Sequence, residues 1–431
     1  MNEAWDRLLN VYDEIADEKY KNCESKLVET SFGKTQTYAC GHRFHSPPVM
    51  FFHGASTDSS VFGEWLLPAV VKQNKFAIAV DYICDTGRST PKDGKVENCP
   101  SNEMEIAQWV EEIATELSLK RPVSMVGYSY GSYIAFLTAL HKPELVAKLV
   151  LLAPAYIFGR MSSSFYLRNM VYRMMPTNST QDWLWKSLTT NSSFSLLTLP
   201  PRDVEHFLAK RDVQATVLKV VSNGCYSHNT LKEVMESHDT FVGIGEKDST
   251  VARTTSTWIA ERALEDGATE AVIYTGAGHL MCWEHPTDEL IVQDVLDFLN
   301  QKTAYHPEPK PMAEPEVHVE KEAEPLVEEP KKKAMAEEPK KNVEETKKKV
   351  EEPKKKAEEP KKKAEEEPKK KVEETKKKVL EEPKKKVEEA KKKVEEPKKP
   401  VDEAKTPDKQ AMKDHHEFDE KIEEILDAVF E

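Results

Sequence analysis

The sequence predicts an α/β protein with a mainly parallel sheet, an N-terminal antiparallel hairpin, a helical cap insertion and a charged tail. Between residues 25 and 302, short apolar runs alternate with amphipathic stretches, as strands and helices do when they take turns in a parallel sheet. A segment rich in Met and aromatic residues, 156–236, interrupts this alternation. After residue 302 the composition changes to Lys, Glu and Pro, which cannot supply a hydrophobic core.

Charge is distributed unevenly and limits the kinds of partner. In residues 303–431, 72 of 129 positions are charged, and no Gly, Trp or Cys occurs. Residues 1–302 carry a net charge of −10 and hold all 15 Gly and all 7 Trp, which is typical of a globular domain. Because nucleic acid and anionic membranes both require a basic surface, this charge argues against them and favours a small-molecule partner.

The strands are expected to begin with a hairpin. After an N-terminal helical extension at residues 1–24, residues 26–30 and 35–40 form two strands that turn at Gly33. The later apolar runs are short and rich in β-branched residues, which predicts buried strands at residues 49–53, 76–83, 123–127, 148–153, 241–245 and 271–275.

Helices are expected between these strands, at residues 60–72, 103–117, 130–141, 255–265 and 288–299. The stretch 103–117 shows the pattern most clearly, because its apolar residues recur at the spacing of one helix face. The segment 156–236 is predicted to form a helical cap over the C-terminal edge of the sheet, where open α/β sheets bind ligands.

The tail divides into a spacer and a terminal helix. Residues 303–413 form a Lys/Glu/Pro-rich spacer with a seven-residue repeat, in which each repeat holds one apolar position and often a Pro. This pattern excludes an ordinary coiled coil and favours a disordered or partly helical spacer. In residues 414–431, apolar side chains recur at helical spacing among acidic neighbours. We expect this amphipathic C-terminal helix to bind a protein partner and not a membrane.

The cysteines and the N-terminus bear on the compartment. Six cysteines lie far apart, with no C-x-x-C pair and no cluster with His, so no metal site is expected and the cysteines are predicted to be reduced core thiols. The N-terminus is acidic, without the apolar segment of a signal peptide, and no run approaches about 18 apolar residues. The sequence therefore predicts a soluble, cytoplasmic protein.

A nucleophile motif lies between a predicted strand and a predicted helix. Residues 127–131 read Gly-Tyr-Ser-Tyr-Gly, with Ser129 at the centre. A sharp strand-to-helix turn would lift the Ser129 hydroxyl above the sheet, and small residues on either side allow the backbone to make that turn. The N-terminus of the following helix also favours developing negative charge.

A serine hydroxyl needs a base, and the base needs a carboxylate that orients it. His279 follows the last predicted strand and is the candidate base. Asp248 follows the preceding strand and is the candidate acid, while Glu246, two residues away, and Asp239, at the start of that strand, remain alternatives. The order Ser, Asp, His matches the order expected for a nucleophile at such a turn.

An oxyanion also needs backbone donors. The strand at residues 49–53 is followed by Gly54 and Ala55, and a glycine there allows a backbone N–H to face the site. The N–H groups of Ala55 and Tyr130 are therefore the expected donors.

Over residues 25–302 the chain resembles the α/β-hydrolase fold family, and within it the bacterial-type serine carboxylesterases. Besides the Ser129, Asp248 and His279 motifs, the resemblance rests on His53-Gly54, Asp81, Gly87-Arg88-Ser89, Glu284 and Pro286. The chain departs from the family's pattern at Ser132, where a second glycine is frequent, at residues 83–86, where a Gly-rich turn is usual, and at the bulky Tyr130. The resemblance implies no metal and no organic cofactor.

The function expected from these residues is hydrolysis of carboxylic esters through an acyl-enzyme, with a small-molecule ester as substrate. Three alternatives remain open. The same three residues could cleave thioesters or C–C bonds or transfer acyl groups, since a fold does not fix its chemistry. The pocket could instead serve as a ligand sensor, or the tail could make the chain a tethered interaction protein.

Overall fold

The computed structural model describes residues 3–43, 47–120, 122–190, 199–222, 225–251 and 254–301. The spacer predicted at residues 303–413 and the helix predicted at residues 414–431 lie outside the described residues.

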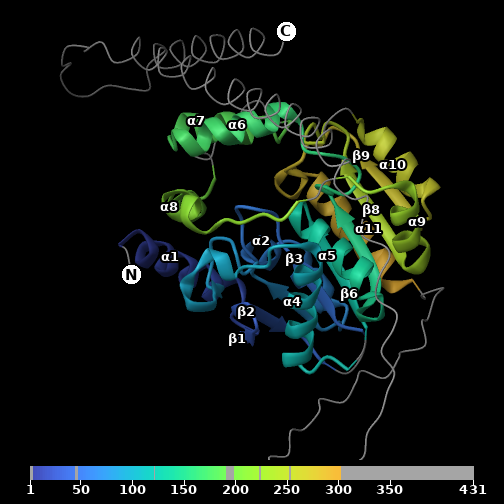
Figure 1. The fold of residues 1–431 in the computed structure, drawn as a ribbon, viewed down its shortest axis with the longest axis horizontal. Coiled ribbons are helices and arrows are strands. Elements are labelled where there is room, and N and C mark those ends of the chain that lie inside the picture. The colour runs from blue at the N-terminus through green and yellow to red at the C-terminus, as the bar shows by residue number, and fades with distance from the viewer. Residues whose placement is uncertain are drawn as a thin grey trace, which may run out of the picture. The chain divides into compact units, whose positions relative to one another are not determined.

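A single sheet extends through the described part of the chain (Figure 1). Its strands follow the order β1-β2-β4-β3-β6-β7-β8-β9, and the short β5 pairs with β2 outside this order. The pairs β1–β2 and β2–β4 are antiparallel, whereas all pairs from β4 to β9 are parallel. This confirms the mainly parallel α/β sheet with an N-terminal hairpin. The strands are β1 Glu24–Thr30, β2 Gly33–Cys40, β3 Val49–Phe52, β4 Ala77–Val80, β5 Thr90–Pro91, β6 Val123–Tyr128, β7 Val146–Leu152, β8 Asp239–Gly245 and β9 Glu270–Tyr274.

Side chains alternate between the two faces of this sheet and build two cores. In β3, Met50 and Phe52 belong to one core, and Val49 and Phe51 to the other, as the two-residue period of a strand requires. Helices α4, α5, α9 and α10 cover the first face, and α2, α3 and α11 cover the second. The helices are α1 Glu3–Lys19, α2 Ser60–Gly63, α3 Leu66–Lys72, α4 Glu103–Glu116, α5 Tyr130–His141, α6 Ser163–Met174, α7 Asn178–Lys186, α8 Pro201–Val217, α9 His228–Ser237, α10 Ser256–Glu265 and α11 Thr287–Asn300.

Two helical segments differ from the expectation. The helix expected at residues 60–72 is two helices, α2 and α3, because Pro68 has no N–H to donate and its ring would clash with the carbonyl of Glu64 in a continuous helix. Within the segment 156–236, α6, α7 and α8 lie apart from the layers that cover the sheet (Figure 1). Helix α9 instead packs Leu231 and Val234 into the same core as α5.

The N-terminal helix α1 packs on α8 (Figure 1). Leu8 of α1 is fully buried together with Ala209 and Val213 of α8. Tyr12 of α1 reaches the sheet, where its hydroxyl donates to Asp81 Oδ2 at 2.6 Å. The N-terminal extension therefore packs against the cap insertion through α8.

The expectation that all six cysteines are reduced thiols is wrong for four of them. Cys23 is bonded to Cys40, and Cys84 to Cys99. The hairpin register explains the first pair: Glu24 lies opposite Ala39, so the residues one step further along each strand also meet. Sequence separations of 17 and 15 residues do not reveal such pairings.

Disulfides are typical of oxidising compartments, so the two pairs weigh against the cytoplasmic location, which stays a prediction. Within the described residues, no helix is both long enough and apolar enough to cross a membrane.

Candidate active site

Ser129 lies at a sharp turn between β6 and α5. Its φ of 55° and ψ of −113° are angles that L residues rarely adopt. Glycine is required on both sides of this turn. A Cβ at Gly127 would lie 2.3 Å from the carbonyl oxygen of Gly131, and a Cβ at Gly131 would lie 1.8 Å from the carbonyl oxygen of Phe52. The turn therefore presents the Ser129 hydroxyl beyond the carboxyl end of β6.

The structure brings Ser129, His279 and Asp248 together. His279 Nε2 lies 2.9 Å from Ser129 Oγ, and His279 Nδ1 lies 2.7 Å from Asp248 Oδ2. Asp248 Oδ1 accepts hydrogen bonds from the N–H and the hydroxyl of Thr250, at 2.9 and 2.6 Å. Burial opposes the charge of Asp248, but His279 and Thr250 outweigh burial and hold the pKa of Asp248 below its ordinary value. The carboxylate is therefore ionised at neutral pH.

The two alternative acids lie elsewhere. Glu246 is exposed, and its Oε2 accepts a hydrogen bond from the N–H of Gly276 at 2.8 Å. Asp239 begins β8, at the other end of that strand, where Lys148 Nζ lies 3.8 Å from its Oδ2. Of these three carboxylates, Asp248 is the one that contacts the imidazole.

Neighbouring groups fix the loop that carries His279. Tyr128 donates its hydroxyl to the carbonyl of His279 at 2.6 Å, and the N–H of Gly278 donates to Glu284 Oε2 at 2.6 Å. Glu284 Oε1 also accepts from the hydroxyl of Thr189, beyond α7, at 2.5 Å. Glu284 therefore joins the histidine loop to the cap insertion.

The loop after β3 is fastened by buried polar groups. His53 Nε2 accepts from the N–H of Tyr82 at 2.9 Å, which assigns the ring proton to Nδ1, 2.8 Å from the carbonyl oxygen of Gly54. Burial lowers the pKa of His53, so the ring is neutral. Asp85 Oδ2 accepts from the N–H of Ser56 at 2.6 Å.

The predicted oxyanion residues lie beside Ser129. A Cβ at Gly54 would lie 3.2 Å from Ser129 Cβ, so the loop passes close to the nucleophile. Tyr130 is the first residue of α5, so its N–H has no acceptor within the helix. The N–H of Ala55 makes no hydrogen bond within the described residues. Gly54, Ala55 and Tyr130 line one cavity together with Ser129 and His279.

This cavity has a volume of about 590 Å³, within the range of small-molecule sites. Its walls are mainly apolar and include many aromatic and methionine side chains, most of them from the cap insertion. They include Tyr156, Met161, Phe165, Tyr166, Met170, Tyr172, Met174, Trp185, Phe207 and Trp283. The cap predicted from the sequence therefore lines the cavity with an adaptable apolar surface.

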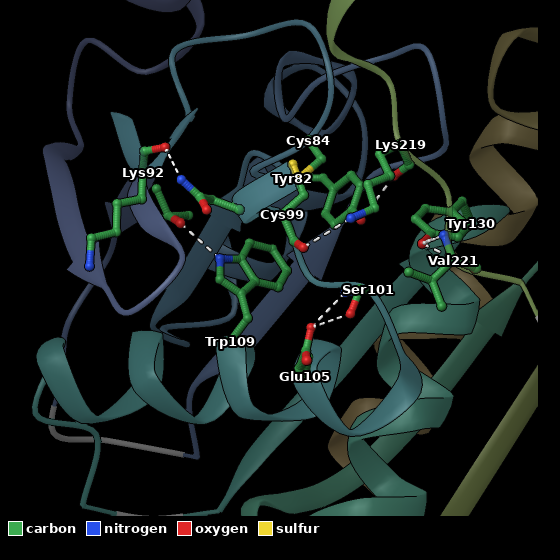
Figure 2. Close-up of a disulfide and its surroundings, with 12 residues drawn as sticks. Tyr82, Cys84, Lys92, Cys99, Ser101, Glu105, Trp109, Tyr130, Lys219 and Val221 are labelled. Atoms are coloured by element: carbon green, nitrogen blue, oxygen red, sulfur yellow. Dashed lines mark hydrogen bonds between the residues drawn. A yellow bond between two sulfur atoms is a disulfide. The ribbon is translucent and has the colours of Figure 1, made fainter. Parts of the chain in front are cut away.

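A strap, residues 218–222, closes one side of the cavity with Leu218, Val220 and Ser222. Figure 2 shows the Cys84–Cys99 disulfide beside it. The hydroxyl of Tyr82 donates to the carbonyl of Lys219 at 3.1 Å, and Lys219 Nζ donates to the carbonyl of Cys99 at 3.2 Å (Figure 2).

Tyr130 holds the same strap. Its hydroxyl accepts from the N–H of Val221 at 3.0 Å and lies 3.3 Å from the carbonyl oxygen of Val221 (Figure 2). The bulky side chain beside the nucleophile is 1% exposed. Its role is to fasten the strap.

Sequence reasoning missed several buried polar residues of the cavity wall, among them Gln181 of α7 and Lys210 of α8. Both residue types are ordinarily exposed on amphipathic helices, so nothing in their sequence context marks them. Among the described residues, no group of three His, Cys, Asp or Glu side chains is arranged to hold a metal ion.

Comparison with known proteins tests whether the chain belongs to a known family. A family model described as alpha/beta hydrolase fold matches residues 47–286. No curated protein matches the sequence.

Solved structures with the same fold include bacterial esterases. Naproxen esterase (carboxylesterase NP) from Bacillus subtilis is 21% identical, with a TM-score of 0.59 over 70% of this chain and 99% of that one. Carboxylesterase CesB from Bacillus subtilis is 24% identical, with a TM-score of 0.58 over 69% and 99% of the two chains. A membrane phospholipase A described as a bacterial virulence factor is 16% identical, with a TM-score of 0.52 over 67% and 90%. At these identities the likeness shows the fold alone.

Proposed function

The chain belongs to the alpha/beta hydrolase fold family, and on this premise we propose that it is a serine hydrolase that cleaves carboxylic esters. One observation carries the proposal: the contacts that run from Asp248 through His279 to Ser129, in a cavity with apolar walls. A buried base that contacts both a serine hydroxyl and an ionised carboxylate is the arrangement that activates a serine.

The contacts support a two-step reaction. Ser129 Oγ attacks the ester carbonyl carbon while His279 Nε2 takes the hydroxyl proton. His279 then gives this proton to the leaving alcohol, and an acyl-enzyme remains on Ser129. Water, activated by His279 in the same way, hydrolyses the acyl-enzyme and regenerates the serine. Asp248 keeps the second ring proton on Nδ1 and stabilises the cationic ring in both steps.

The tetrahedral intermediates carry an oxyanion, for which the N–H groups of Ala55 and Tyr130 are the proposed donors. Both residues line the cavity together with Ser129, and Tyr130 follows the nucleophile directly, at the start of α5. Loss of one such donor ordinarily costs about 10²- to 10³-fold in rate. The close approach of Gly54 to Ser129 supports this placement.

The cavity walls support an apolar acyl group of small or medium size. Met161, Phe165 and Met170 are side chains that adapt their shape to a hydrocarbon ligand. The carboxylesterases among the structural neighbours make esters the first class of substrate to test.

The test is Ser129→Ala, with fluorophosphonate labelling and a panel of nitrophenyl esters as the two readouts. The variant should lose both labelling and ester turnover while it keeps the thermal midpoint, because one hydroxyl is removed. Ser164→Ala, an exposed serine of α6, is the matched control and should keep both. Labelling or turnover that persists in Ser129→Ala would refute the proposal.

The same panel separates the alternatives. Matched oxygen esters and thioesters of one acid, compared by kcat/KM, distinguish an esterase from a thioesterase. A protein that is labelled at Ser129 but turns over neither class would favour the sensor or the tethered interaction protein.

A further inference from the structure

The wall of the cavity holds a buried polar pair that the proposed reaction does not use. Gln181 of α7 is 2% exposed and Lys210 of α8 is 4% exposed, and both line the cavity. Their neighbours in the wall are apolar, among them Leu184, Trp185 and Phe207. A buried amide and a buried ammonium in such a wall call for polar partners.

Helices α7 and α8 contact each other at two points, and Gln181 and Lys210 lie between these two points along the helices. At one end, Arg211 Nη1 donates to Asn178 Oδ1 at 2.8 Å. At the other end, the rings of Trp185 and Phe207 meet at a centroid distance of 4.7 Å. Gln181 lies between Asn178 and Trp185 at helical spacings of three and four residues, so it shares their face. Lys210 lies between Phe207 and Arg211 in the sequence of α8, so it stands at the same level of the two helices as Gln181. Its ammonium group, like the ring of His206 four residues earlier, meets Asp58.

Lys210 also reaches the loop that carries the proposed oxyanion donor. Its Nζ lies 2.6 Å from Asp58 Oδ2, three residues beyond Ala55. His206, one turn earlier on α8, places its Nε2 3.1 Å from the same oxygen. The ammonium therefore lies between the cap helix and the oxyanion side of the cavity.

Both polar groups have unused hydrogen-bonding capacity within the described residues. Gln181 Oε1 is buried without a partner there. Lys210 has three donors, and Asp58 is the one acceptor that it meets in that part of the chain. A ligand group that accepts from Lys210 and donates to Gln181 would satisfy both.

The charge around the pair favours a neutral group over an anion. Burial opposes ionisation of Asp58, but Lys210 and His206 outweigh burial and hold the pKa of Asp58 well below its ordinary value, so the ion pair is neutral as a whole. Burial lowers the pKa of His206, which adds no positive charge at neutral pH. Asp85, whose pKa burial raises to about 6, is still ionised at pH 7 and would repel a carboxylate.

We propose that Gln181 and Lys210 form a polar subsite that binds a hydroxyl group of the substrate, at a distance from the scissile ester. A hydroxyl both accepts and donates, so it can accept from Lys210 Nζ and donate to Gln181 Oε1. The preferred substrates are then esters with a free hydroxyl on either the acyl or the alcohol part. This inference rests on the proposed esterase function and names its substrate class.

The experiment compares kcat/KM for matched ester pairs that differ by one hydroxyl. One arm places the hydroxyl at successive positions of the acyl chain of nitrophenyl esters, and the other places it on the alcohol chain of alkyl acetates. The hydroxylated member of the best pair should be favoured by about tenfold or more, the effect of one hydrogen bond to a charged group. The arm that shows the preference assigns the subsite to the acyl or the alcohol part.

Two variants test the residues. Gln181→Met keeps the length of the side chain, and the ratio of kcat/KM for the hydroxylated over the plain ester should fall towards one. Lys210→Met should lower this ratio in the same way. This variant also leaves Asp58 buried without its cation, so it could fail to fold. In that case Gln181→Met decides the test. Lys232→Met, on α9 and outside the cavity, is the control and should keep the ratio.

Three results would overturn the inference: no hydroxyl preference in either arm, a preference that persists in Gln181→Met, or a stronger preference for a carboxylate at the same position. Failure of the proposed function is seen separately. In that case the plain esters are not hydrolysed, or their hydrolysis persists in Ser129→Ala.

Discussion

Replacement of Asp248 by Asn tests the identity of the acid. In the native site Oδ1 of Asp248 accepts two hydrogen bonds from Thr250, and Oδ2 faces His279 Nδ1 at 2.7 Å. An Asn there will keep its carbonyl oxygen on the two Thr250 donors, because its NH₂ group cannot accept them. The NH₂ group then faces Nδ1, which must accept, and the ring proton moves to Nε2. In that tautomer His279 cannot take the proton of Ser129.

The expected loss in kcat is about 10⁴-fold, or about 5 kcal/mol, the effect known for a triad aspartate held in place by its neighbours. The side chains have nearly the same shape, so the thermal midpoint should change little. The matched control is Glu246→Gln, two residues away. A Gln can still accept from the N–H of Gly276, and kcat should stay within about twofold of the native value.

The assay is hydrolysis of a nitrophenyl ester under saturating conditions, with the folded fraction measured for each variant. A larger loss in Glu246→Gln than in Asp248→Asn would assign the acid to Glu246. Equal and small losses in both would show that His279 does not depend on either carboxylate, and the reasoning from the Thr250 contacts would be wrong.

Three further predictions concern stability. Burial raises the pKa of Asp85 to about 6, so between about pH 4 and pH 6 its carboxyl is protonated in the folded chain but ionised in the unfolded one. This group therefore lowers the free energy of unfolding by about 2 kcal/mol as pH rises from about 4.5 to 7. Asp85→Asn should remove that part of the pH dependence in urea titrations at the two pH values; an unchanged slope would contradict it. Replacing Cys84 and Cys99 together by Ser opens a loop of 15 residues and should lower the free energy of unfolding by about 3 kcal/mol. The control, Cys225→Ser, removes a free exposed thiol and should lower it little. Equal urea midpoints for the double variant and the native chain would show that the disulfide does not stabilise the fold. Ending the chain after Lys302 should leave kcat and the thermal midpoint equal to those of the full chain within error, because the charged tail lacks the apolar residues of a core. A thermal midpoint lower by several degrees in the shortened chain would show that the tail contacts the folded part.

The fold class and the nucleophile could be predicted from the sequence because their determinants are local. The apolar runs, their alternation with helix patterns and the glycines at 127 and 131 all lie within a few residues of the feature that they predict. The structure adds the reason for those glycines, since any side chain at Gly131 would overlap the carbonyl oxygen of Phe52. The break between α2 and α3 was equally local, and Pro68 was the signal that could have found it.

The choice of acid and the pairing of the cysteines depended on the tertiary structure. Asp248 and Glu246 are two residues apart in one loop, and only the fold of that loop turns one towards His279 and the other towards Gly276. Cys84 and Cys99 meet because the chain between them folds back beside the strap, which no spacing rule encodes.

The residues of the cavity wall could not be predicted from the sequence either. A lysine and a glutamine on amphipathic helices are normally solvated, and Lys210 and Gln181 become buried because α8 is packed between α1 and the loop of Asp58 while α7 covers it. Sequence alone determined which residue could be the nucleophile, because a strained turn is made by its immediate neighbours. Tertiary structure alone decided what faces that nucleophile, because those groups come from distant segments that only packing brings together; His279, for example, is 150 residues from Ser129 in the sequence.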